Sequence, residues 1–111
     1  MSEPRVKVGL WVKMALRMAD ISGRSGAVLR KGDPDSGGIL VVLRGREGLI
    51  VLSQVRAADN TQAWLRATGL TPVDQSTTDA YIDRQLRTDP DLWVIECDSP
   101  DFVPPFEARL L

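Results

Sequence analysis

Acidic side chains crowd the stretch RTDPDLWVIECD at residues 87–98. Three of them, Asp91, Glu96 and Asp98, could bind a divalent cation, because hard cations prefer carboxylate oxygens. Glu96 and Asp98 share one strand face by two-residue alternation. The usual metal-dependent nuclease carries an acid-x-Lys element on such a strand, and this strand has no lysine to activate water. A metal-dependent hydrolase using these three acids is therefore an alternative, and we expect no metal site.

The trio Asp-Pro-Asp occurs at residues 89–91 and also at 33–35, inside GDPDSGG. The earlier copy resembles the start of an EF-hand loop, which needs a bidentate acid at its twelfth position. Arg44 stands there, so a calcium loop is excluded. Aspartate accepting from its own backbone, proline presetting φ and glycines allowing positive φ predict a tight turn. The later copy predicts a turn between a helix and a strand, because proline disfavours the helical region at the preceding residue.

The chain lacks residues that several kinds of catalytic site require. The chain has no histidine and one cysteine, Cys97, which excludes a Ser-His-Asp or Cys-His site and an intramolecular disulfide within one chain. Cys97 shares a strand face with Trp93 and Ile95, so we expect core packing. Gly23-Arg-Ser-Gly26 follows a helix and precedes a strand, the reverse of a phosphate-binding loop. We therefore expect no catalytic residue and no cofactor.

Arginines and a tryptophan offer a second alternative. Arg44, Arg56 and Arg66 fall on predicted strands or their ends, and Trp64 shares a face with Arg66. Such a face could stack bases or hold an anion. The net charge of −1 gives no support to nucleic-acid binding. An outward face of solvated arginines is the preferred interpretation, and we do not expect a nucleic-acid partner.

The length of 111 residues and a hydrophobic share of 43% predict a single domain over residues 1–111. Apolar periodicity predicts a helix over 5–21, ended by Gly23, and a second helix from a capping Ser76 to about Arg87. Short apolar runs predict five strands, at 27–31, 39–44, 49–55, 62–67 and 92–97. The proline-interrupted tail, 99–111, is expected to be extended.

Short polar loops join the first four strands, which predicts an antiparallel meander. The predicted fold is an α+β sandwich of two layers, with a mainly antiparallel five-stranded sheet and both helices packed on it, in the order α-β-β-β-β-α-β. The residues expected in or near the core are Leu10, Trp11, Met14, Leu40, Val42, Leu52, Leu86, Trp93 and Ile95.

The first helix has more apolar surface than one sheet needs. Its apolar residues cover about 240° of the helical wheel, whereas a little over 100° is enough to pack on a sheet. The extra surface must contact the tail or a second subunit. Charge is also split: residues 1–56 hold ten Lys/Arg against five acids, and residues 57–111 hold four against ten. Both features predict a homodimer, near twice 12.2 kDa, through Val8, Trp11, Val12 and Leu16.

No apolar run is long enough to cross a membrane, and charged residues interrupt the N-terminal apolar stretch. We therefore expect a cytoplasmic protein without a membrane partner.

Three stretches together are similar to a known family: Gly9-Leu10-Trp11-Val12 in the first helix, residues 30–38 at the first turn, and residues 89–93 before the last strand. In this order they resemble the short, mostly alphaproteobacterial proteins of domain-of-unknown-function family 1491. The resemblance implies a bacterial, cytoplasmic setting and brings no activity or site residue. The function expected from the sequence is thus a non-enzymatic binding or protein-interaction module.

Overall fold

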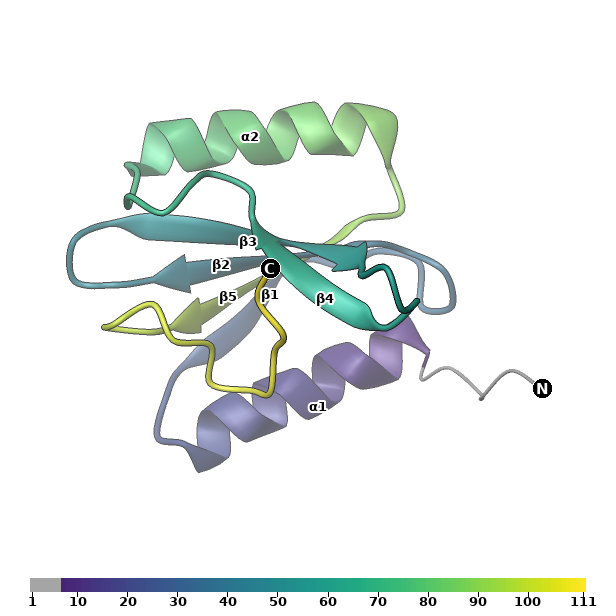
Figure 1. Ribbon diagram of the computed structural model, residues 1–111, viewed down its shortest axis with the longest axis horizontal. Helices are drawn as coiled ribbons and strands as arrows, with labels where there is room; N and C mark the ends of the chain where they lie inside the picture. The colour runs from purple at the N-terminus through teal and green to yellow at the C-terminus, as the bar shows by residue number, and fades with distance from the viewer. Residues whose placement is uncertain (1–6) are drawn as a thin grey trace.

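The computed structural model describes residues 7–111, and the first two residues of the predicted helix, 5 and 6, lie outside that range. The predicted order of elements is confirmed (Figure 1). The elements are α1 (Val8–Ile21), β1 (Gly26–Arg30), β2 (Ile39–Arg44), β3 (Leu49–Arg56), β4 (Gln62–Arg66), α2 (Gln75–Thr88) and β5 (Trp93–Asp98).

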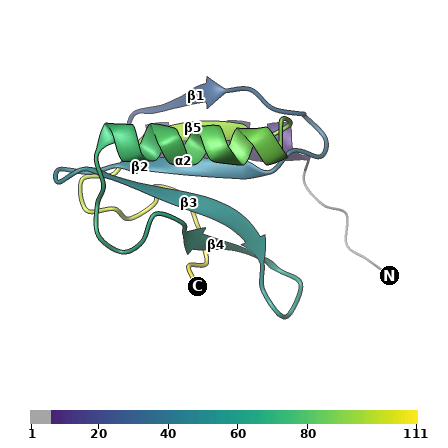
Figure 2. The same cartoon turned by 90° about the horizontal axis from the view of Figure 1, so that it is seen from above.

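The five strands form one mixed sheet in the order β1-β5-β2-β3-β4 (Figure 2). Strands β2, β3 and β4 form an antiparallel meander as predicted. The predicted pairing of β1 with β2 is wrong, because β5 lies between them, antiparallel to β1 and parallel to β2. Burial explains this position: Trp93, Val94 and Ile95 bury apolar side chains on both faces of the sheet, whereas every residue of β1 is exposed.

The two helices cover opposite faces of the sheet, so the predicted two layers are in fact three (Figure 1). Strands β2 and β5 supply both cores by alternation. Val41 and Ile95 face α1, while Leu40 and Val94 face α2. A strand with apolar residues on both sides needs cover on both sides, which is why a single helical layer does not suffice.

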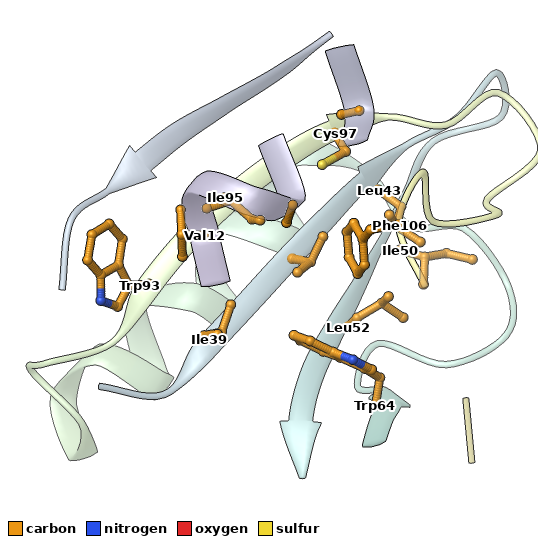
Figure 3. Packing of buried hydrophobic residues seen from close by; sticks show 13 residues of the cluster. Val12, Ile39, Leu43, Ile50, Leu52, Trp64, Trp93, Ile95, Cys97 and Phe106 are labelled. Carbon is orange, nitrogen blue, oxygen red and sulfur yellow. The ribbon is translucent and has the colours of Figure 1, made fainter. Parts of the chain in front are cut away.

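An aromatic cluster closes the core beside α1. The Trp11 ring centroid lies 5.3 Å from that of Trp64 and 5.2 Å from that of Phe106, the latter pair edge to face. Phe106 comes from the tail, which crosses the α1 side of the sheet and places this ring among the core residues in Figure 3. The tail then runs beside β4. The backbone N–H of Trp64 donates to the backbone carbonyl of Arg109 at 2.8 Å, and the backbone N–H of Leu111 donates to the backbone carbonyl of Trp64 at 2.9 Å.

The core prediction is wrong at two positions. Leu10 and Met14 are 54% and 53% exposed, because α1 turns Val12, Ala15 and Ala19 towards the sheet. Trp11 and Leu86 lie partly buried at the margins of the two cores. The remaining predicted core residues, Leu40, Val42, Leu52, Trp93 and Ile95, are buried as expected.

The helix ends follow local capping rules. Gly23 ends α1 with φ +74°, and its N–H donates to Asp20 O while that of Arg24 donates to Ala19 O. The predicted cap of α2, Ser76, is wrong: the Asp74 carboxylate accepts from the Thr77 N–H at 2.8 Å. The hydrogen bonds from Thr77 lower the pKa of Asp74.

Candidate functional site

Three distant segments meet at one end of the sheet. The Asp33 N–H donates to the carbonyl oxygen of Asp91 at 2.9 Å, and the Trp93 indole N–H donates to the Asp33 carbonyl at 2.7 Å. At the start of α1, the Gly9 N–H donates to the Pro34 carbonyl at 3.0 Å. The two Asp-Pro-Asp trios and the first turn of α1 therefore form one unit, which we call the loop junction (residues 9, 31–38 and 89–93).

Acids at the loop junction hold backbone turns. Asp33 Oδ1 accepts from the N–H groups of Asp35 and Ser36, at 2.8 and 3.0 Å, and these bonds lower the pKa of Asp33. Asp89 Oδ1 likewise accepts from the Asp91 N–H at 3.1 Å. A Cβ at Gly32 would collide with the Asp91 carbonyl oxygen, so the segments approach closely because a glycine stands there.

The acids of the proposed hydrolase do not converge. Asp91 precedes β5 and Asp98 ends it, and the seven residue steps from one to the other extend over roughly 23 Å at about 3.3 Å per residue. Glu96 lies between them and accepts from Arg44 Nε at 3.0 Å. Within residues 7–111, no three Asp, Glu, Cys or His side chains lie close enough to hold a metal ion. The structure therefore does not bring Asp91, Glu96 and Asp98 together at one cation site.

The residues of the predicted Arg and Trp surface also lie apart from one another. Trp64 is 2% exposed because α1 and the tail cover it, so its ring offers no face to a base. Arg44 pairs with Glu96 beside β5, whereas Arg56 lies at the far end of β3 and donates to Asn60 O at 2.9 Å. Arg66 is half-buried on β4. The four residues form no common surface.

Cys97 lies in the core beneath α1 (Figure 3). Its side chain is fully buried, and burial raises the pKa of the thiol to about 11. The thiolate is the reactive form of cysteine, so this environment suits packing and not nucleophilic attack.

The four residues of the predicted dimer contact pack mainly against the core of their own chain. Val12 is 2% exposed, and the other three predicted residues, Val8, Trp11 and Leu16, pack partly buried against the same core. A different set of apolar side chains points outwards from α1. We call these residues, Leu10, Met14, Met18 and Ile21, the outer stripe; they are between 46% and 67% exposed. Their spacing of four, four and three residues places them on one side of the helix. The 240° apolar arc of the first helix indicated in the sequence that some apolar surface would stay exposed. It did not indicate which residues of the arc these would be.

A groove of about 500 Å³ runs between α1 and β1 and ends at the loop junction. Leu10 connects the groove to the outer stripe. Its apolar lining also includes Val12, Leu16, Val28, Pro34 and Trp93. We call the groove and the outer stripe together the α1–β1 face.

Charged residues rim the groove. Lys7 pairs with Asp35 at 3.4 Å, both side chains being well exposed. Lys13 and Lys31 stand on the same rim and form no ion pair with the residues described. An apolar floor with unpaired cations at its rim suits an amphipathic, anionic ligand.

The family model of DUF1491, a protein of unknown function, matches residues 6–107. The chain belongs to the DUF1491 family. The predicted family resemblance is thereby confirmed. The segments that carry it, around Gly9, at 30–38 and at 89–93, are those that meet at the loop junction.

Solved structures share the DUF1491 fold. A crystal structure of a DUF1491 family protein from Caulobacter crescentus superposes with a TM-score of 0.84 at 28% identity, over 96% of this chain and 100% of that one. An NMR structure of a DUF1491 family protein from the same organism gives 0.84 at 26% identity, covering 98% and 99%. A solution structure of a protein from A. tumefaciens gives 0.77 at 22% identity, covering 95% of each chain, and shows likeness of fold. No curated protein sequence matches this chain.

Among residues 7–111, no helix has both the length and the apolar character needed to span a bilayer.

Proposed function

We propose that this DUF1491 protein is a cytoplasmic, non-enzymatic module that binds a segment of another protein through the α1–β1 face. The observation that carries the proposal is the continuity of the outer stripe with the groove. Contiguous exposed apolar surface, rimmed by polar residues, is typical of interaction sites. Here the stripe and the groove meet at Leu10, and beside it lies Lys13, which pairs with no acid in the described part of the chain.

The charge of this face favours an acidic partner. Residues 7–31, which span α1 and β1, contain six cationic residues and the single acid Asp20. The cationic residues are Lys7, Lys13, Arg17, Arg24, Arg30 and Lys31. Opposite charges across an interface accelerate association and suppress wrong partners, so the partner segment should combine apolar side chains with Asp or Glu.

The homodimer stays a prediction, and this face supports it poorly. A two-fold contact sets the same patch of each subunit against itself, which would bring Lys13 and Arg17 of both copies together. A dimer near twice 12.2 kDa would therefore need another surface. Sedimentation at high concentration tests the dimer independently of the α1–β1 face.

Selection from a library of displayed random peptides tests the proposal. Peptides of about ten residues are long enough to span β1 or to form a short helix against α1. Two exposed residues serve for matched variants: Met14→Glu on the outer stripe and Leu70→Glu, a position 78% exposed in the loop after β4. Selected peptides should be rich in acidic and apolar residues, lose binding to Met14→Glu and keep it to Leu70→Glu. No enrichment, or equal binding to both variants, would contradict the proposal.

A further inference from the structure

We propose that the partner segment binds as an extended strand that pairs with the open edge of β1, next to the groove. This inference rests on the proposed function and names the binding mode and the chemistry of the partner. The occupant is an acidic segment in which apolar side chains alternate with Asp or Glu.

The two edges of the sheet differ. The tail pairs with β4 through Trp64 and so covers that edge. Among residues 7–111, strand β1 pairs with β5 alone, and all five of its residues are exposed. Figure 2 shows β1 at the outer border of the sheet, opposite the border where β4 and the C-terminus lie. An uncovered edge offers a row of unpaired N–H and C=O groups to another chain.

The β5 pairing identifies the free backbone groups of β1. The Asp98 N–H donates to the Ser25 carbonyl at 2.7 Å, so Ser25 bonds towards β5. In an antiparallel ladder the bonded residues alternate, and Gly26 stands opposite Cys97 and Val28 opposite Ile95. The N–H and C=O groups of Gly26 and Val28 therefore point to the open edge. A register shift follows Val28, which limits the free edge to a short run.

Side chains beside this edge are partly uncovered. Val28 stands opposite Ile95, which faces α1, yet Val28 remains 42% exposed because none of the described strands flanks it on the outer side. Below it, Leu16 and Leu10 line the groove. A strand added beside β1 would direct alternate side chains into this groove. The intervening side chains of the strand would face away from α1.

The lysines beside the groove favour an acidic strand as the partner segment. The side of α1 next to β1 carries Lys13, with Lys31 directly after the strand, and both rim the groove. Carboxylates on the added strand would meet these lysines. A second copy of this chain would bring its own β1 and its own lysines to the same place, with like charges opposed. This addition of a strand at an edge is an established form of peptide recognition, in which main-chain bonds provide affinity and pockets for side chains provide specificity.

The probe is a synthetic, fluorescently labelled peptide of about ten residues in which valine alternates with glutamate, compared with its valine–lysine counterpart. Binding is followed by fluorescence anisotropy at low and high salt. The glutamate peptide should bind at least about tenfold more tightly than the lysine peptide, and added salt should weaken it. Equal binding of the two peptides would overturn the acidic specificity.

Two substitutions at Val28 separate pairing from side-chain contact. Val28→Pro removes the N–H that points to the open edge and keeps the β5 ladder, whereas Val28→Ala keeps the N–H and shortens the side chain. Affinity should fall roughly tenfold with Val28→Pro, the value of one backbone hydrogen bond, and less with Val28→Ala. Circular dichroism checks that both variants fold. If both bind alike while Met14→Glu still abolishes binding, the strand mode fails and the proposed function stands.

Two further outcomes identify other occupants. Concentration-dependent dimerisation that Val28→Pro abolishes would assign the edge to a second copy and overturn the acidic-strand proposal. Binding to phosphatidylglycerol vesicles without binding to the glutamate peptide would assign the outer stripe to a lipid surface and overturn it as well. If neither the glutamate peptide nor any selected peptide binds, the proposed function itself fails.

Discussion

The backbone N–H of Asp33 donates to the carbonyl oxygen of Asp91 across 2.9 Å. This bond joins the two Asp-Pro-Asp trios, and the Trp93 indole reinforces it through the Asp33 carbonyl. The repeated motif is therefore two halves of one structural unit. Its carboxylates hold turns, while its backbone groups fix the loop junction that ends the groove.

Close packing at the loop junction predicts a specific sensitivity to glycine substitution. Gly32→Ala should destabilise the protein by roughly 2 kcal/mol or more, because its Cβ would enter the space of the Asp91 carbonyl. Urea denaturation measures the change.

The matched control is Gly9→Ala, where the new Cβ would make ordinary contacts of 3.5 Å and longer with Pro34. Alanine at this helical position should be neutral or stabilising by up to about 1 kcal/mol. Equal loss of stability in the two variants would contradict the description of the junction.

The tail is expected to be an integral part of the core. Phe106→Ala should destabilise by about 3–5 kcal/mol, because the ring is 9% exposed and packs against Trp11 and Trp64. Tryptophan emission should shift to the red as both indoles gain water. Val103→Ala, in the same tail at a position 62% exposed, should change little. Similar changes in stability for Phe106→Ala and Val103→Ala would contradict the assignment of Phe106 to the core.

Acid should weaken the fold through the capping aspartates. Hydrogen bonds lower the pKa values of Asp33 and Asp74 from the ordinary 3.8 in the folded protein, so the unfolded state binds more protons. Their contribution to stability is full above 3.8 and is lost as the pH falls through the folded-state values. Asp33→Asn and Asp74→Asn should show a shallower loss of stability than the wild type in urea denaturation between about pH 7 and pH 3. Parallel curves would contradict these assignments.

Cys97 should resist thiol reagents in the folded protein. Its burial and its pKa of about 11 leave little accessible thiolate at about pH 8. Labelling with a chromogenic disulfide should be slow in buffer and complete in urea. Rapid stoichiometric labelling of the native protein would show that the core beneath α1 opens readily.

Local features of the fold could be predicted from the sequence, whereas several contacts between distant segments could not. Apolar periodicity, Gly23 and the proline-linked turns identify the helices, strands and breaks, since these depend on neighbouring residues. The insertion of β5 between β1 and β2 depends on pairing between segments distant in the sequence. The residues of β1 do not indicate which strand they pair with. The unbroken apolar run of β2 indicated that both faces of this strand are buried. The prediction of two layers left one of these faces uncovered.

The same limit applies to the candidate site. Alternation placed Trp64 on one face of β4 with Arg66, whereas the burial of Trp64 depends on α1 and the tail, which are distant in the sequence. The excess apolar surface of α1 indicated an interaction surface. The rotation of the helix, set by Val12 and its neighbours against the sheet, determines that Leu10 and Met14 are the exposed residues, whereas Trp11 and Leu16 pack against the core.

An amide chemical-shift titration of the ¹⁵N-labelled protein with the valine–glutamate peptide shows directly which residues contact an acidic strand. We expect the largest shifts at Gly26 to Val28 and along α1 from Leu10 to Arg17, with α2 and β4 unchanged. Largest shifts on α2 or along β4, or no shift anywhere at saturating peptide, would contradict this expectation.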